Sequence, residues 1–312
     1  MNEPRPGAAM ALAGAAEPAD LVAPAGVSPV VGAPVVGAPV VGAPVVGAPV
    51  VGAPVVVAVD DSATAFGAVA WAADEAAARG CGLVVLGAVD DLGVGAGRHP
   101  GGVLEHARGV ARRRQPSLVV GVRRVDDEPV AGLLDVAEDA RLLVLGAASG
   151  PGPSDLVGRT SCPVVVVLAS PDGPVGPDGP VVAGVDGTTA DTAVLAAAFG
   201  AAAAHDLPLT VVHAGHGPRP RVPDDVDDQL AAWSVPYPSV RVTADAVQEE
   251  PATALALRSS GAALVVVGGG RHGGVGTVGR ALLTASACPL LFAATPLGGR
   301  ERTGPGTADA AS

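Results

Sequence analysis

Short runs of apolar residues alternate with helix-prone stretches along residues 54–293. The runs are continuous in Val and Leu, which is typical of strands buried on both faces of a parallel sheet. Residues 63–79 and 189–204 are rich in Ala, the best helix former, and Ser62 and Thr188 stand where a helix N-cap belongs. The pattern predicts two sets of five strands, near residues 55–59, 83–89, 117–124, 142–146 and 163–168, and near 181–185, 208–213, 239–243, 263–268 and 289–293.

The second set of strands repeats the first at a fixed offset. Pro54–Ser62 aligns with Pro180–Thr188, 126 positions later, and Cys162 aligns with Cys288 at the same offset. Strands that alternate with helices inside such a repeat predict parallel sheets with right-handed crossovers. We therefore expect an α/β architecture of two doubly wound, five-stranded, Rossmann-like domains, each with strand order 3-2-1-4-5.

The flanking segments lack this pattern. Val30–Pro54 consists of five Val-Val-Gly-Ala-Pro units, and its prolines argue against a membrane helix although no charge occurs between Asp20 and Asp60. We expect a disordered tail over residues 1–53, a first domain over 54–169, a turn-rich linker over 170–179, a second domain over 180–296 and a disordered tail over 297–312.

Composition narrows the classes of function. The chain has 31 acidic and 19 basic residues and a formal net charge of −12, which argues against a nucleic-acid partner. Every basic residue other than His is Arg, so a Walker A or Schiff-base lysine is excluded. Three Cys without a Cys-x-x-Cys pair indicate a reduced, cytoplasmic chain. The absence of Lys and Ile indicates a GC-rich source with an actinobacterial type of composition.

Four segments carry a resemblance to a known family. Val57–Ser62 and Ala183–Thr188 each close a strand with Asp and open a helix, and the second copy ends with Gly276–Arg280 and Cys288-Pro289. In this order and spacing they resemble the universal stress protein family, over about residues 54–168 and 180–293. The resemblance implies a tandem, two-domain regulatory protein of the stress response that binds ATP, with Mg²⁺ as a possible companion ion, and that is not an efficient enzyme.

The predicted ligand site lies in the second domain. In an open parallel sheet, ligands bind beyond the carboxyl ends of the strands where the strand order reverses, here between the strands that end at Asp186 and Gly268. Glycines after Gly268 allow an anion-binding nest, and a helix start near Thr277 adds a positive dipole end. With the roles that the resemblance implies, the expected nucleotide-binding residues are Gly184, Val185, Asp186, Thr188, His213, Gly268, Gly273, Gly274, Gly276, Thr277, Val278 and Gly279.

The glycine loops depart from the pattern of the family. In the second copy, Arg271 replaces the second glycine of the motif, and the loop is five residues shorter than the motif requires. In the first copy, Cys162 follows Gly146 by 16 positions, whereas Cys288 follows Gly268 by 20. Prolines and Asp155 in that shorter loop disfavour phosphate. Asp60 and Gly146 are therefore the weaker candidates for a second nucleotide site.

Other functions remain open alternatives. Loss of the nucleotide would leave a scaffold or protein–protein interaction module on the same fold. His213 and His216 have a spacing seen in metal sites, but no third ligand follows, so we predict neither a metal site nor catalytic residues. The two fifth strands are expected to pair within the chain and hide their edges, and a homodimer is possible in addition. No membrane partner is expected.

Overall fold

The computed structural model describes residues 52–60, 62–88, 102–125, 129–147, 152–168, 179–188, 190–214, 221–270 and 274–294. The two predicted tails and the predicted linker fall almost entirely outside these residues, as does Gly273 of the predicted site. We refer to the described parts of residues 52–168 as the first copy and of residues 179–294 as the second copy.

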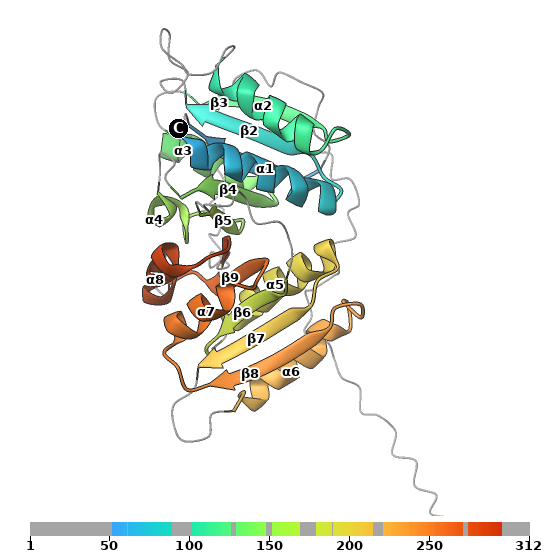
Figure 1. The fold of residues 1–312 in the computed structure, drawn as a ribbon, viewed down its shortest axis with the longest axis vertical. Helices are drawn as coiled ribbons and strands as arrows, with labels where there is room; N and C mark the ends of the chain where they lie inside the picture. The colour runs from blue at the N-terminus through green and yellow to red at the C-terminus, as the bar shows by residue number, and fades with distance from the viewer. Residues whose placement is uncertain are drawn as a thin grey trace, which may run out of the picture. The chain divides into compact units, whose positions relative to one another are not determined.

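Strands and helices alternate in both copies (Figure 1). The first copy contains β1 (Val55–Val59), α1 (Ala63–Ala78), β2 (Leu83–Ala88), α2 (Val103–Arg114), β3 (Val120–Val125), α3 (Pro129–Glu138), β4 (Leu142–Gly146), α4 (Pro153–Leu156) and β5 (Val164–Val167). The second copy contains β6 (Val181–Val185), α5 (Asp191–His205), β7 (Leu209–Ala214), α6 (Asp224–Ser234), β8 (Val242–Val247), α7 (Pro251–Ser259), β9 (Leu264–Gly268), α8 (Thr277–Ala285) and β10 (Leu290–Ala293).

The strands form one sheet in the order β3-β2-β1-β4-β5-β10-β9-β6-β7-β8. All neighbours within a copy pair in parallel, and each half has the order 3-2-1-4-5 when its own strands are counted along the chain. β5 and β10 pair antiparallel, with Val166 opposite Leu290 and Val164 opposite Phe292. The predicted α/β fold class is confirmed.

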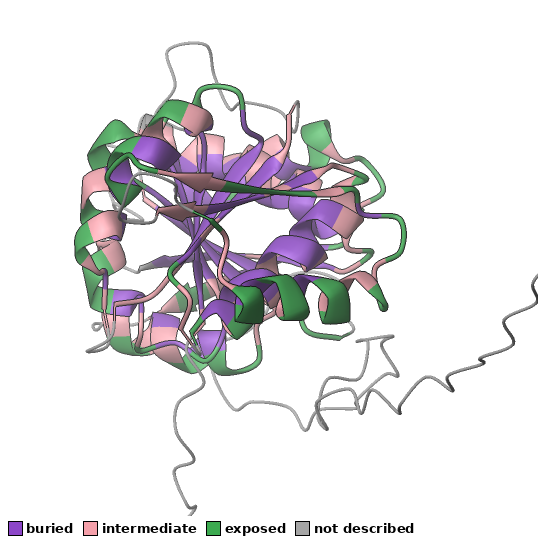
Figure 2. Ribbon diagram, turned by 90° about the horizontal axis from the view of Figure 1, so that it is seen from below, coloured by how far each residue is buried: buried purple, intermediate pink, exposed green. Residues whose placement is uncertain are grey.

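Helices cover both faces of the sheet, because the side chains of each strand alternate between two apolar clusters. Val55, Val57 and Val59 of β1 belong to one cluster, together with residues of α1, α2, α5 and α6. Val56 and Ala58 belong to the other, together with residues of α3, α4, α7 and α8. Figure 2 shows the consequence: the inner strands are buried, the edge strand β8 is largely exposed, and other exposed residues lie mainly on the outer sides of the helices.

One of the two predicted helix caps is confirmed and the other is wrong. Ser62 is the N-cap of α1, and its hydroxyl accepts a hydrogen bond from the Ala65 amide at 3.1 Å. Thr188 does not cap α5, which begins at Asp191. The Asp191 carboxylate instead accepts the amide of Thr188 at 3.2 Å, so the acceptor lies inside the helix and the donor before it.

The third strand of each copy begins later than the apolar pattern predicts. We expected a strand near 239–243, whereas β8 runs from Val242 to Val247. Val240 closes a turn, in which its amide donates to the carbonyl of Tyr237 at 3.1 Å. β8 lies at the edge of the sheet and carries exposed polar residues such as Asp245, so its apolar signal is weak.

No helix in the described part of the chain is long and apolar enough to cross a membrane.

Candidate functional site

A pocket of about 660 Å³ opens at the carboxyl ends of β6 and β9. These strands are neighbours in the sheet, and their connections run to opposite faces, so a crevice forms where the strand order reverses. Its lining residues come from the second copy and are Gly184, Val185, Asp186, Thr188, Ala190, Asp191, Val194, Val212, Ala214, Pro251, Leu255, Val267, Gly268, Gly269, Gly270, Gly274, Val275, Gly276, Thr277, Val278, Gly279 and Arg280.

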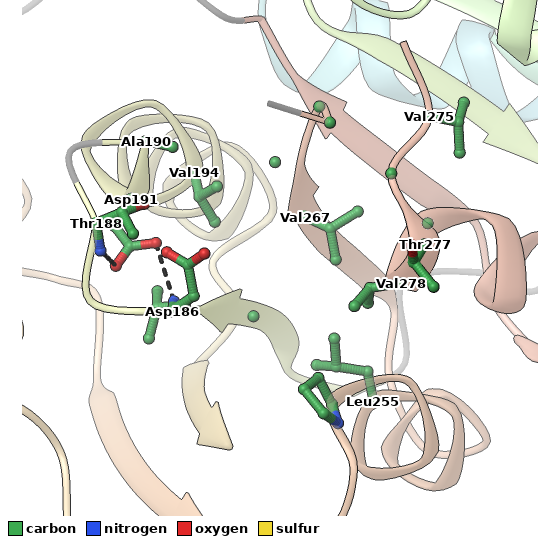
Figure 3. A pocket seen from close by; sticks show the side chains of 18 of the residues that line it. Asp186, Thr188, Ala190, Asp191, Val194, Leu255, Val267, Val275, Thr277 and Val278 are labelled. Atoms are coloured by element: carbon green, nitrogen blue, oxygen red, sulfur yellow. Dashed lines mark hydrogen bonds between the residues drawn. The ribbon is translucent and has the colours of Figure 1, made fainter. Parts of the chain in front are cut away.

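One wall of the pocket is acidic. Asp186 follows β6 and is exposed, whereas the side chain of Asp191 in the first turn of α5 is buried beside it (Figure 3). The Asp191 carboxylate accepts hydrogen bonds from three successive amides, those of Asp186 at 3.1 Å, Gly187 at 2.8 Å and Thr188 at 3.2 Å. Asp191 therefore fixes the backbone on which Asp186 is carried.

The pKa of Asp191 reflects two opposing effects. Burial raises it, and the neighbouring charge of Asp186 raises it further. The amide hydrogen bonds from residues 186–188 stabilise the carboxylate and lower the pKa, but they do not outweigh burial, and the pKa lies above its ordinary value. The carboxylate is held in place by the fold at some electrostatic cost, which makes this wall a poor position for a phosphate.

The opposite wall is the N-terminus of α8, and Figure 3 shows Thr277 and Val278 across the pocket from Asp186. Gly276 is the N-cap and has no side chain that could accept the first amides of the helix, and the first turn carries no acidic residue. The amides of such a turn, together with the helix dipole, favour an anion. Arg280 is the single basic residue among the described residues that line the pocket, and it lies on this side.

Apolar side chains lie between the two walls. Val194 of α5, Val267 of β9 and Leu255 of α7 come from three elements of the second copy, and Figure 3 places them between Asp186 and Val278 or beside that gap. A flat heterocycle fits against such a surface, while its polar edges reach the backbone at the strand ends. The pocket is thus divided into an acidic side, an apolar middle and an amide-rich side.

Several glycines of the pocket are explained by packing. A Cβ on Gly184 would stand 2.8 Å from Cδ1 of Leu255, and one on Gly279 would stand 2.6 Å from Cε1 of Phe292. A Cβ on Gly270 would meet the Gly276 amide nitrogen at 2.9 Å, because the loop folds closely on itself there. These positions need Gly whether or not a ligand binds, so the sequence signal of a phosphate nest is partly a signal of close packing.

Ten of the twelve residues predicted for the second-domain site line this pocket. His213 does not; its neighbours Val212 and Ala214 do. The ring Nδ1 of His213 lies 3.3 Å from the Val185 carbonyl oxygen, so this side chain interacts with the backbone of β6. Gly273, Arg271 and His272 lie outside the described residues.

The prediction missed side chains that reach the pocket from other elements. Asp191 was detectable as an acidic residue in the first turn of a helix, a common partner for free amides. Val194 and Leu255 carried no chemical signal, because an apolar residue on a buried helix face looks the same whether it lines a pocket or fills a core.

The weaker site predicted in the first copy has a different local structure. The Asp60 carboxylate accepts the Ser62 amide at 3.0 Å, as in an ordinary turn, and Gly146 is buried at the end of β4. α4 has one turn, where the second copy has the longer α8. Asp155 in that turn accepts the Gly152 amide at 3.0 Å, so a carboxylate of the chain already satisfies the helix N-terminus.

No group of three or more His, Cys, Asp or Glu side chains in the described ranges could hold a metal ion. Cys162 and Cys288 are buried at the approach to β5 and β10, and burial raises the pKa of each thiol to about 11. A thiol with such a pKa is a poor nucleophile, so these residues serve as small core side chains.

Comparisons with known proteins place this chain in a family. The model of the universal stress protein family matches residues 53–167. The universal stress protein Rv2623 of Mycobacterium tuberculosis is 31% identical over 284 residues, which cover 76% of this chain and 95% of that protein. Rv2028c of the same organism is 30% identical over 262 residues, covering 75% of this chain and 94% of the relative.

A solved structure shares the fold. A universal stress protein from Archaeoglobus fulgidus DSM 4304 has a TM-score of 0.56 at 15% identity, over 77% of this chain and 96% of that one. The α/β domains with a crevice at the strand ends define the class of fold. The relatives, which align with this chain along nearly their whole length, define the family. The chain belongs to the universal stress protein family.

Proposed function

We propose that this protein is a regulatory protein of the stress response that binds an adenine nucleotide, ATP, in the pocket of its second copy. The observation that carries the proposal is the N-terminus of α8, which faces the pocket and has no side-chain cap. In the first copy the corresponding turn is capped by Asp155. The difference supports one working site, in the second copy, and a first copy that does not bind nucleotide.

The three regions of the pocket suggest how the nucleotide lies. The phosphates belong at Gly276, Thr277 and Val278, where amides, the helix dipole and Arg280 favour negative charge. The ribose hydroxyls are donors and match the carboxylate of Asp186, which would repel a phosphate. The adenine ring then lies over the apolar middle of the pocket.

Mg²⁺, if it takes part, arrives with the triphosphate. The oxygens of Asp191 already accept three amides, which leaves Asp186 as the carboxylate on that wall with access to the ligand. A single exposed carboxylate far from the phosphate end does not make a magnesium site of its own. We therefore propose binding without efficient turnover, since no side chain among the described residues that line the pocket is placed to activate a water at the phosphates.

The pairing of β5 with β10 supports a single-chain unit in which both inner sheet edges are satisfied. We propose that the copies stay paired in the cell, that the chain acts in the cytoplasm, and that any homodimer uses another surface. A nucleotide, rather than a nucleic acid or a membrane, is the partner that the pocket and the acidic composition favour.

A second candidate is a nucleotide-free interaction module. Two observations favour it: the acidic pair Asp186 and Asp191 in the pocket, and the turn at Asp155, whose own carboxylate takes the place that an anion would need. In this case the pocket would be empty in the cell, and the outer helices would carry the function.

The test is the nucleotide content of the purified protein, compared between two charge variants of α8. Thr277→Glu places a carboxylate in the first turn, where the helix dipole stabilises the carboxylate but the carboxylate repels phosphate. Thr284→Glu adds the same charge to an exposed Thr near the other end of the helix. Protein is heated, and the supernatant is resolved by ion-exchange chromatography.

Near-stoichiometric adenine nucleotide in the wild type and in Thr284→Glu, but not in Thr277→Glu, supports the site. Wild-type protein without nucleotide, and without binding when ATP and Mg²⁺ are added back, would refute it and leave the interaction module. Equal nucleotide in all three proteins would show that the ligand binds elsewhere.

A further inference from the structure

The short turn that replaces α8 in the first copy is held by its own contacts. We refer to residues 152–157 as the supporting turn. Besides the bond between the Gly152 amide and the Asp155 carboxylate, the Val157 amide donates to the Pro153 carbonyl at 2.9 Å. Arg159 adds a hydrogen bond from its guanidinium to the Asp155 carbonyl at 3.1 Å. A segment with this many internal bonds has few other conformations available.

The supporting turn is exposed at Ser154 and Asp155, but its last two residues are deeply buried. Leu156 is fully buried and Val157 is 1% exposed. Both belong to the apolar cluster that also contains Val275 and Phe292 of the second copy. Because this cluster joins residues of both copies, Leu156 and Val157 belong to the apolar core that the copies share.

The point of contact on the second copy is the segment that leads into α8. A Cβ built on Gly274 would stand 4.0 Å from the carbonyl oxygen of Val157, so the two segments are close neighbours in the fold. Figure 1 shows α4 of the first copy facing α8 of the second. Val275, the next residue, is buried in the shared cluster, and Gly276 then caps α8.

The described part of the loop before α8 consists largely of glycine. The Gly270 amide donates to the Gly274 carbonyl at 2.6 Å, which closes the loop on itself. Gly270, Gly274 and Gly276 have no side chains to pack, so the position of the loop depends on the surfaces it rests against. One of those surfaces is the supporting turn.

We propose that Leu156 and Val157 of the first copy are positioning residues for the anion-binding N-terminus of α8 in the second copy. The first copy, whose own loop is closed by Asp155, thereby takes part in the site of its neighbour. This inference rests on the proposed function for the identity of the ligand, while the support of α8 itself is a property of the protein without ligand.

The consequence for binding is selective. The acidic wall and the apolar middle are built from β6, β7, β9, α5 and α7 of the second copy, whereas α8 on the phosphate side follows a loop that lies beside the supporting turn. Loosening the supporting turn should weaken the binding of ligands that carry phosphate and leave the binding of a ligand that lacks phosphate unchanged. A general loss of stability would not discriminate between the two ligands.

The experiment compares Val157→Ala with Val136→Ala in the full chain. Both remove the same two methyl groups from buried positions of the first copy in the same cluster, but Val136 lies on α3. Hydrogen exchange without ligand is followed at the amides of Arg280–Leu283; the Arg280 amide bonds to Gly276 in the first turn of α8. Calorimetric titration then gives the dissociation constants of ATP and adenosine.

Val157→Ala should raise the rate of hydrogen exchange at these amides by about tenfold. It should also raise the dissociation constant of ATP by about tenfold, since a small displacement of positioned donors is costly. Adenosine should change by less than about twofold, and Val136→Ala should leave all three quantities near wild type. Equal exchange at α8 in the two variants overturns the proposal. If wild-type protein binds neither ligand, the proposed function fails, and the exchange measurement still decides whether the turn supports α8.

Discussion

Glu75 and His205 belong to different copies, and their Oε2 and Nε2 atoms lie 2.6 Å apart. Glu75 is 1% exposed on α1, and its other oxygen accepts Nε of Arg79 one turn later. His205 is the last residue of α5. At the offset of 126, Ala201 replaces Glu75 and His205 replaces Arg79, so the second copy has no equivalent carboxylate. Among the described residues, the contact between Glu75 and His205 therefore links the copies in a way that the internal repeat does not duplicate.

Removing this buried carboxylate should destabilise the protein. Glu75→Ala leaves Arg79 and His205, which are both partly exposed, without their buried partner, and we expect a loss of about 2 kcal/mol in the free energy of unfolding. Urea denaturation measures it. Glu105→Ala is the matched control, because its pair with Arg108 on α2 is partly exposed and should contribute less than about 1 kcal/mol. Equal losses in the two variants would show that the contact between copies contributes nothing special.

The two buried carboxylates should give opposite dependences on pH. For Glu75, burial raises the pKa, but the hydrogen bond from His205 and the charge of Arg79 outweigh it, so the pKa lies below its ordinary value. Its contribution to stability is present above the pKa of the unfolded chain and is lost as pH falls through the folded pKa. The stability advantage of wild type over Glu75→Gln should therefore shrink in acid.

For Asp191, burial raises the pKa above its ordinary value. The protonated form is favoured in the folded state, so its contribution is present below the unfolded pKa and is lost as pH rises through the folded pKa. The stability of wild type relative to Asp191→Asn should decrease as pH rises from acid toward neutral. Denaturation of the three proteins across that range measures both trends, and parallel curves for Glu75→Gln and Asp191→Asn would contradict the assignment.

The sequence was sufficient for the fold because its signals are redundant there. Each Val-rich run, the Asp or Gly at its end and its repetition 126 residues later all predict the same strand. The error at β8 shifted the start of that strand and left the strand order unchanged. The contact between Glu75 and His205 could not be predicted in this way. It depends on the register of β5 against β10, and each residue by itself looks like an ordinary polar position on an Ala-rich helix.

Residues of the candidate site could be predicted where they stand at the ends of strands or helices. They could not be predicted where packing between elements brings them to the pocket. Asp186 and Thr277 were found because they stand at the ends of elements. His213 was assigned to the pocket because it lies at the end of a strand, but alternation along β7 directs its ring to the Val185 carbonyl. Leu255 was missed because its role comes from the approach of α7 to Gly184.

The three thiols should react more slowly in the folded protein than in the unfolded protein. Burial raises the pKa of Cys162 and Cys288 to about 11 and also raises that of Cys81, which is half-buried. In folded protein at mildly alkaline pH, we expect a maleimide to modify Cys81 slowly and the other two hardly at all. Intact-protein mass spectrometry counts the labels, and denatured protein should accept all three. Rapid labelling of Cys162 or Cys288 in folded protein would contradict their burial.

Two Gly→Ala variants separate the packing role of glycine from its flexibility. At Gly279, the new methyl group would stand 2.6 Å from the buried ring of Phe292 and 3.0 Å from Val275, so the ring or α8 must move. We expect a loss of about 2 kcal/mol, typical of overpacking. At Gly67 in α1 no atom lies within 4 Å of the new methyl group, and Ala should stabilise the helix by about 0.5–1 kcal/mol. Thermal unfolding measures both effects. A Gly279→Ala protein as stable as wild type would mean that α8 moves freely away from β10, and the constraint on Gly279 would then have to come from the ligand.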